Sequence, residues 1–473
     1  MTGSYIKIPF SIWKNNVNAD SSDDFFSSPL WFFILIASCA VPYCYGAYAV
    51  SFGLCAAYMC VALVCTRNIM PSFAAFLFCS VAVIELHGIT QGEIFGYAWV
   101  LIPVVPALIY HIVRFNRARP KYRPGKTVLP QAAVSVVLLI GGAGYLSAEQ
   151  YFRIEPMYYV LFLGAALTGM TVLLESDLPD DGEYAASYLS ATMMAIAALL
   201  LLMWLAAFLS DGNAGFPYRQ WKNNAGNFML LSVPLTLWRG SKARCGTLHA
   251  TFAVLQAFSV AASGSRGATL MMGIVLPSAL AVYFFGLKGK RKLFESAMFA
   301  LFAVAVCAVL FADGARRLHG FFGEMDILDG HGREKLYAEG WKNFLQHPLF
   351  GVGLAYRNDD VYPLNDMAIF WYHSTPVQIL ASTGAIGFAA YAWQFLVRMK
   401  IAFKRNSFNI MALIGFLGFE GYSCVNTGDF TPLPFAVLAV FIFLVLERYT
   451  KTVKDGEDSV VAHGKPNNKG EKT

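Results

Sequence analysis

Long apolar runs alternate with short polar segments along almost the whole chain. The runs are continuous and do not alternate with polar residues, and many approach the roughly 20 apolar residues that a helix needs to cross a bilayer. Because lipid cannot satisfy backbone polar groups, this pattern predicts membrane-spanning helices and excludes a β-barrel. Fourteen runs fall near residues 29–43, 45–65, 70–86, 96–114, 128–147, 157–175, 187–209, 226–238, 246–262, 268–286, 294–312, 374–396, 408–424 and 432–447.

The pattern therefore predicts an all-α polytopic membrane protein with about 12–14 transmembrane helices. The first two runs are short and are separated by Pro42-Tyr43-Cys44-Tyr45-Gly46, which fits either a tight hairpin or one broken span. Residues 1–28 are polar and lack a small-residue cleavage site, so the first run is expected to be an uncleaved anchor.

Composition supports the same class. Of the 473 residues, 57% are hydrophobic and 14% are charged, against roughly 25% charged in soluble proteins. The mean hydropathy is +0.50. The net charge of +6 comes from short basic clusters between apolar runs, which does not indicate a nucleic-acid partner. The nine cysteines form no CxxC pair and are interpreted as small buried hydrophobes.

The basic residues also predict the orientation, since cytoplasmic loops are enriched in Lys and Arg. One set of alternate loops carries eighteen of them, whereas the other short loops carry four. The first set is therefore placed in the cytoplasm, with both termini. The expected divisions are a cytoplasmic N-terminal segment (1–28), transmembrane helices (29–209 and 210–312), a long periplasmic segment (313–372), transmembrane helices (373–447) and a disordered cytoplasmic tail (448–473).

Ser265-Arg266-Gly267 lies in a very short outward turn between two apolar runs. Small neighbours leave room for an anion to reach the guanidinium and the first amides of the helix that follows, where the dipole favours phosphate. The alternative is an arginine that snorkels to lipid headgroups. Arg219 is a second outward cation, next to Tyr218 and near Lys222. Aromatic neighbours there suit a sugar or a lipid–water interface equally well.

His373 opens the helix that follows the long polar segment. A helix N-terminus disfavours imidazolium, so the ring is expected to be neutral and able to accept a proton. Alternatively, Ser374 or Thr375 caps the helix and His373 is a bystander. The four histidines of this region lack metal-ligand spacing, and no phosphate-binding loop or dinucleotide motif occurs, so no metal or other cofactor is expected.

Taken in order, the motifs resemble the O-antigen ligase and polymerase family of bacterial envelope proteins. They are Tyr218-Arg219, Ser265-Arg266-Gly267, Gly332-Arg333, Trp341, His347-Pro348-Leu349-Phe350-Gly351-Val352-Gly353, His373 and Gly384-Ala385-Ile386-Gly387. The resemblance covers roughly residues 200–450. It implies a GT-C-like glycosyltransferase of the inner membrane, independent of metal and nucleotide sugar, whose active site faces the periplasm.

By this resemblance, the donor is a glycan on undecaprenyl diphosphate, and the acceptor is a hydroxyl of lipid A–core in lipopolysaccharide biosynthesis. Arg266 and Arg219 would grip the diphosphate, with Ser265, Gly267, Tyr218 and Lys222 completing the substrate site. His373 would activate the acceptor hydroxyl, and Arg333 would have a structural or donor-binding role. The sequence departs from the family at Ser374, where many members have Asn.

Three other functions stay open from the sequence. An O-antigen or exopolysaccharide polymerase would extend a second lipid-linked glycan at the same kind of site. A protein O-oligosaccharyltransferase is disfavoured because such relatives often carry a further C-terminal region. A transporter predicts internal repeats and charges deep within the helices, and only Glu85 and Glu420 fit that description.

Overall fold

The computed structural model describes residues 21–83, 96–116, 124–141, 154–211, 222–287, 289–309, 333–354, 356, 358, 361, 370–426, 428 and 433–463. All secondary structure in this part of the chain is helical. The N-terminal half contains α1 (Ser21–Phe26), α2 (Pro29–Cys44), α3 (Tyr48–Cys65), α4 (Met70–Leu77), η2 (Phe78–Val83), η3 (Ala98–Leu101), α7 (Val104–Asn116), α8 (Val128–Gly141), α10 (Ile154–Leu161), η4 (Phe162–Ala166), α11 (Leu167–Asp177) and α12 (Gly182–Asp211). The C-terminal half contains α13 (Lys222–Lys242), α14 (Gly246–Ala262), α15 (Arg266–Gly286), α16 (Gly289–Val309), α18 (Arg333–Gln346), α19 (Thr375–Ala402), α20 (Ser407–Ser423) and α21 (Leu433–His463).

The described part of each of the fourteen predicted apolar runs is helical over most of its length, which confirms the all-α fold class. Within the described residues, five helical segments are long and apolar enough to cross a membrane, and five further apolar helices are shorter. The first two runs form a hairpin, because α2 and α3 are joined by a short turn and the Ser38 and Tyr58 hydroxyls are hydrogen-bonded at 2.9 Å.

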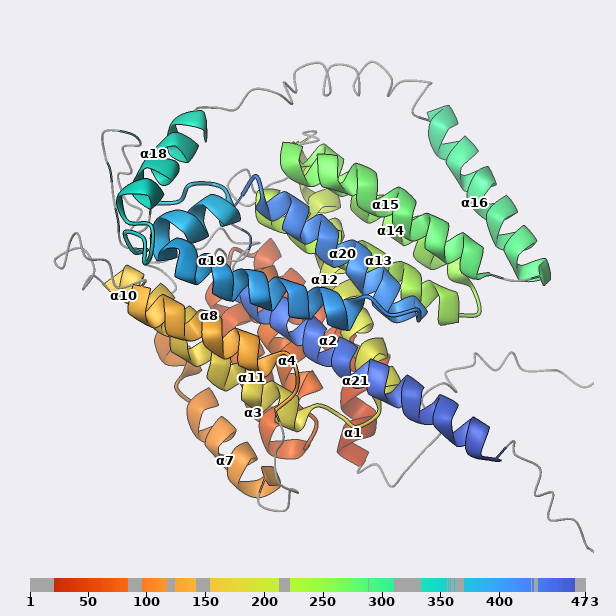
Figure 1. The fold of residues 1–473 in the computed structure, drawn as a ribbon. Helices are drawn as coiled ribbons and strands as arrows, with labels where there is room; N and C mark the ends of the chain where they lie inside the picture. Colours follow the sequence, from red (N-terminus) through yellow and green to blue (C-terminus); the bar gives the residue numbers. More distant parts are fainter. Residues whose placement is uncertain are drawn as a thin grey trace, which may run out of the picture.

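The centre of the molecule is formed by α13 and α21. Helix α13 packs against α12, α14, α15 and α20, and α21 packs against α12 (Figure 1). Residues Phe435–Leu446 of α21 are all buried, as expected for a helix that is apolar on every side. Helix α13 also buries polar groups, and Thr236 accepts a hydrogen bond from Gln256 of α14 at 3.0 Å. Apolar side chains gain little by leaving lipid for another helix, so hydrogen bonds of this kind help to hold helices together in a bilayer.

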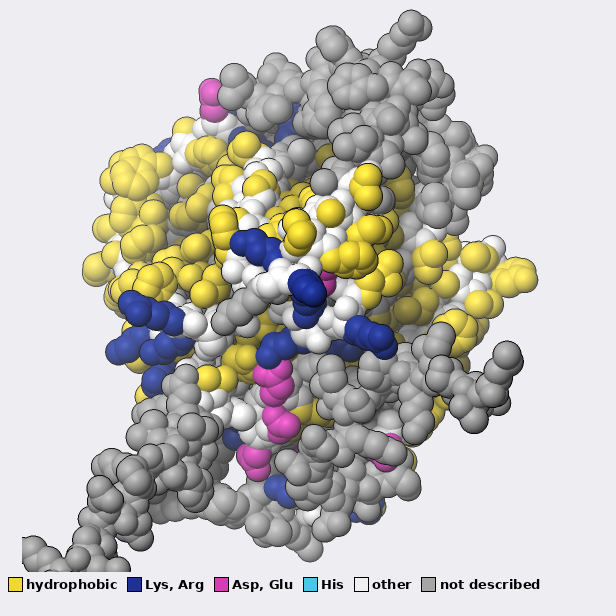
Figure 2. Space-filling model, turned by 90° about the vertical axis from the view of Figure 1, so that its right-hand side faces the viewer, with side chains coloured by type: hydrophobic (Ala, Val, Ile, Leu, Met, Phe, Trp, Pro, Cys, Tyr) yellow, Lys and Arg dark blue, Asp and Glu magenta, His cyan; other side chains and the backbone are white. Residues whose placement is uncertain are grey.

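The basic loops meet at one end of the bundle. Lys242 forms an ion pair with Glu183 at 3.1 Å, so the acidic loop after α11 lies among loops of the basic set. Arg291 donates to the carbonyls of Gly240 and Ala243 at 3.0 and 2.8 Å. Figure 2 shows Lys and Arg side chains gathered below a broad hydrophobic face. The structure therefore groups these loops as the charge pattern predicts.

The expected disordered tail from Arg448 onwards is wrong for residues 448–463, because α21 continues to His463. The extension is anchored by side-chain contacts. Tyr449 is buried against Trp238 and Phe408, and Arg448 pairs with Asp180 at 3.1 Å. The Thr452 hydroxyl accepts a hydrogen bond from the Gly182 amide at 3.0 Å. These tertiary contacts favour the helix in a segment whose composition suggested a solvated end.

Helix α19 is broken at Gly384, where φ is 64° and ψ is −164°. This backbone conformation is essentially restricted to glycine. The loop after α18 fills the break and hydrogen-bonds to the backbone on both sides of it. The bonds are Val352 N to Ala381 O (2.8 Å), Gly353 N to Ser382 O (2.9 Å), Ala385 N to Pro348 O (2.8 Å) and Ile386 N to Leu349 O (3.2 Å). The His347–Gly353 and Gly384–Gly387 motifs therefore form one backbone clamp between α18 and α19.

We expect Gly384→Ala to lower the free energy of unfolding by about 2–4 kcal/mol, from backbone strain and overpacking. A Cβ at Gly384 would lie 2.4 Å from the Leu349 carbonyl. Gly169→Ala is the matched control, because nothing lies within 4 Å of that position in α11. The thermal unfolding midpoint of the protein in detergent measures both variants. An unchanged midpoint for Gly384→Ala would contradict the clamp.

Candidate active site

The C-terminal end of α20 contacts three of the predicted site segments. Arg333, at the start of α18, donates to the Val425 carbonyl at 2.9 Å. A Cβ on Gly267 would lie 3.1 Å from the Val425 side chain. The Thr375 amide donates to the Asn426 carbonyl at 2.9 Å. The turn before α15, the start of α18 and the start of α19 therefore meet at Val425 and Asn426.

The turn that contains Ser265 also contacts α13. The Ser265 hydroxyl donates to the Asn223 side-chain carbonyl at 2.7 Å instead of capping α15. A Cβ on Gly226 would lie 2.6 Å from the Ala268 Cβ, so the first turns of α13 and α15 are in close contact. Arg266 is the first residue of α15 and is half-buried. Its position at a helix N-terminus favours a bound anion.

Part of the predicted phosphate site lies outside the described residues. Arg219 and Tyr218 belong to this part, and of Lys222 only the backbone is described, as the first residue of α13. Asn223, which contacts Ser265, follows Arg219 by four positions in the sequence. Pairing of Arg219 with Arg266 stays a prediction.

His373 has a φ of 53°, which is the one positive value at a non-glycine among the described residues. A strained backbone of this kind persists only where surrounding contacts hold it. Its Nδ1 atom is buried and has no hydrogen-bond partner in the described part of the chain. Burial lowers the pKa of His373, the positive charge of Arg333 lowers it further, and the Asn426 side chain acts in the opposite direction. The imidazole is therefore held in its neutral form.

The backbone on both sides of His373 is held by side chains. Tyr372 is fully buried, its hydroxyl accepts from Asn343 at 2.8 Å and its amide donates to the Gln378 side chain at 3.0 Å. Tyr337 donates to the His373 carbonyl at 3.3 Å. Ser374 is the N-cap residue of α19 but forms no side-chain cap bond, so the hydroxyl-capping alternative is wrong for Ser374. These bonds place an unpartnered nitrogen at a defined position.

The α18 helix is fastened to the chain after it through a buried carboxylate. Glu339 accepts from the Tyr356 hydroxyl at 2.5 Å and from Asn358 at 2.9 Å, and it pairs with Lys342 at 3.5 Å. Burial acts to raise the pKa of Glu339, but the hydrogen bonds from Tyr356 and Asn358 and the charge of Lys342 lower it overall. The carboxylate therefore stays ionised and holds this part of the long segment in place beside His373.

Sequence reasoning missed the residues that assemble the site. Val425 and Asn426 act through their backbone carbonyls, which any residue type supplies, so no sequence signal identifies them. Asn223 and Asn343 do carry a signal, because polar amides that face a predicted cavity often bond buried groups. Asn223 stands beside the predicted Tyr218-Arg219 segment and Asn343 lies in the long segment, so both could have been proposed.

We expect Arg333→Gln to raise the pKa of His373, because it removes one of the two causes that lower that pKa. At mildly acidic pH, more of the imidazole is then protonated. The carbethoxylation rate of His373 by diethyl pyrocarbonate, followed by peptide mass spectrometry across pH, measures this directly. The midpoint should move to higher pH in Arg333→Gln. It should stay unchanged in Arg333→Lys, which keeps the charge, and in Lys335→Gln, which changes an exposed charge on the same helix. Equal midpoints in Arg333→Gln and wild type would refute the coupling.

Comparison with known proteins bears on the same region. Residues 251–392 match the O-antigen ligase family. The matched residues include Arg266, Arg333 and His373 and leave out Arg219. No curated protein matches the chain in sequence. The match confirms, for the segment that spans residues 251–392, the resemblance to the O-antigen ligase family found in the sequence motifs.

Proposed function

We propose that this protein is an O-antigen ligase that moves a glycan from undecaprenyl diphosphate to a hydroxyl of lipid A–core. The observation that carries the proposal is the meeting of the Arg266 turn, Arg333 and His373 at the end of α20. All three lie in the region that matches the O-antigen ligase family. A cation at a helix start, a second arginine and a neutral imidazole are the groups that transfer from a diphosphate requires.

In this proposal, the acceptor hydroxyl oxygen attacks the anomeric carbon of the donor sugar. The bond between that carbon and the diphosphate oxygen breaks, and the lipid diphosphate leaves with the electron pair. Arg266 and Arg219 stabilise the negative charge that develops on the diphosphate. Ser265, Gly267, Tyr218 and Lys222 line the path of the donor, and Arg333 fixes the cover of the site.

His373 takes the proton that the acceptor hydroxyl loses. Its unpartnered Nδ1 atom supports this role, because a base needs a nitrogen that is not already bonded. The lowered pKa of His373 supports it as well, since the ring is then neutral over a wider range of acidic pH. The site would face the periplasm, because the basic loops cluster at the opposite end of the bundle from His373 and a lipid-linked donor would be reached there.

The same site could extend a second lipid-linked glycan, which would make the protein a polymerase. The two activities differ in the acceptor alone, and the groups that bind the donor are shared. The envelope glycans of a deletion strain therefore decide between them.

We expect His373→Ala to lower glycan transfer about 10²–10⁴-fold, because it removes the base. Arg266→Ala and Arg219→Ala should each lower it about 10²-fold or more, because each removes charge stabilisation. Transfer is measured with purified protein and a lipid-linked donor, at matched expression. Arg67→Ala is the control, since Arg67 is exposed in a loop of the basic set. Near-wild-type transfer by His373→Ala would exclude it as the base.

We expect deletion of the gene to remove all polymer from lipid A–core while long chains stay on the lipid carrier. Gel and mass analysis of lipopolysaccharide and of the lipid-linked pool measures both. Lipid A–core capped with a single repeat would instead support the polymerase. An unchanged envelope profile would contradict both functions.

A further inference from the structure

Arg398 is a buried cation outside the candidate active site. It lies on the part of α19 that follows the break at Gly384, twenty-five positions after His373 in the sequence. The residue is 6% exposed, although arginine is among the residues that are rarely buried unless paired. It lies beyond the residues that match the O-antigen ligase family. Burial of an ionised group within a membrane bundle commonly marks a functional site.

Within the described residues, the Arg398 guanidinium has aromatic neighbours and no carboxylate partner. It lies 5.9 Å from the ring centroid of Phe416 and 5.4 Å from that of Phe443. Its Nε atom is buried without a hydrogen-bond partner. Glu447 follows Phe443 by one turn of α21, but its oxygens accept from the Lys126 amide at 3.0 and 3.1 Å. Among the described residues, no carboxylate oxygen lies within 4.0 Å of the nitrogens of Arg398.

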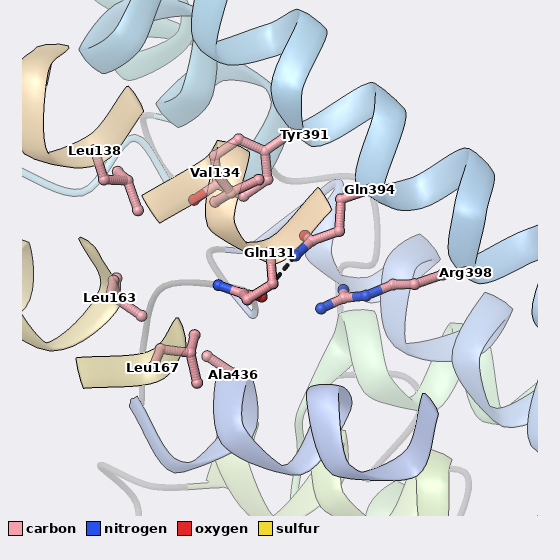
Figure 3. A pocket seen from close by; sticks show the side chains of 9 residues that line it. All are labelled: Gln131, Val134, Leu138, Leu163, Leu167, Tyr391, Gln394, Arg398 and Ala436. Atoms are coloured by element: carbon pink, nitrogen blue, oxygen red, sulfur yellow. Dashed lines mark hydrogen bonds between the residues drawn. The ribbon is translucent and has the colours of Figure 1, made fainter. Parts of the chain in front are cut away.

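Arg398 lines a small cavity between α8, η4, α11, α19 and α21 (Figure 3). Its volume is about 20 Å³, which is enough for one particle of the size of water. Gln394 of α19 donates to the Gln131 side-chain carbonyl at 2.7 Å, which leaves the NH₂ group of Gln131 as a donor. The nine lining residues include one cation and no carboxylate. The polar part of the cavity is thus rich in donors and carries a positive charge.

We propose that Arg398, together with Gln131, binds one small anionic group in this cavity. The group is either a free anion of about the size of chloride or a phosphate oxygen of a membrane lipid, since both offer a compact negative charge to the same donors. A guanidinium is well suited to such a partner because its donors form a planar fork. The bound group joins α19 to α8 and α21 and so stabilises the bundle. This inference does not depend on the proposed transfer reaction.

The test is the thermal unfolding midpoint of the full-length protein in detergent, with chloride replacing gluconate at constant ionic strength. A ligand that binds only the folded state raises the midpoint with its concentration. For a free anion, wild type should gain about 2 °C or more over a hundredfold rise in chloride. Arg398→Gln should lose this gain, and Lys400→Gln should keep it, because Lys400 is exposed on the same helix.

For a lipid phosphate, chloride has no effect on wild type, and the purified protein retains about one more phospholipid phosphorus per chain than Arg398→Gln. If Arg398→Gln does not fold, Gln131→Leu is compared with wild type instead. The two measurements are then equilibrium binding of radiolabelled chloride and phosphorus analysis of the purified protein. Either saturable chloride binding or one retained lipid, weakened in the variant, supports the site. The proposal is overturned if the wild-type protein shows neither saturable chloride binding nor a retained lipid. It is also overturned if the variant equals wild type in both measurements.

Discussion

The break in α19 at Gly384 constrains how α18 and α19 are placed at the candidate site. A backbone group without a hydrogen bond is costly in a bilayer, so a helix can be interrupted there only where protein supplies the missing partners. Residues 348–353 supply them on both sides of Gly384. Because this loop continues directly from α18, the clamp joins α18 to α19. His373, two residues before the first residue of α19, is then held at one position relative to α18 and Arg333.

The candidate site is assembled largely by backbone carbonyls. Arg333 and Thr375 bond the carbonyls of Val425 and Asn426, which follow the end of α20. Both residues lie beyond the C-cap residue Cys424, so no intrahelical hydrogen bond uses their carbonyls, and these can accept bonds from other segments. The positive φ of His373 is a strained backbone conformation. Such strain persists only where contacts with the surrounding structure hold the backbone in place.

Two basic side chains lie near opposite ends of α19, and burial affects their charges differently. His373 lies before the helix, where burial and a nearby cation keep an imidazole neutral. Arg398 lies within the helix, where burial cannot neutralise a guanidinium, because arginine keeps its proton in proteins. One end can therefore exchange a proton, whereas the other holds a permanent charge that needs an anionic partner. One helix thus connects a candidate catalytic centre with a candidate anion site.

The sequence by itself determined the helices, because a bilayer requires continuous apolar runs and each run became a helical segment. It also singled out Arg266 and His373 as candidate site residues, and the family resemblance added Arg333, but their roles stay predictions. Only the tertiary structure decided the clamp at Gly384, the extension of α21 through Tyr449, and the use of Val425 and Asn426 as the meeting point. These features depend on contacts between residues that are distant in sequence. Hydropathy measures the preference of each residue for lipid or water, but it carries no information about which residues contact one another.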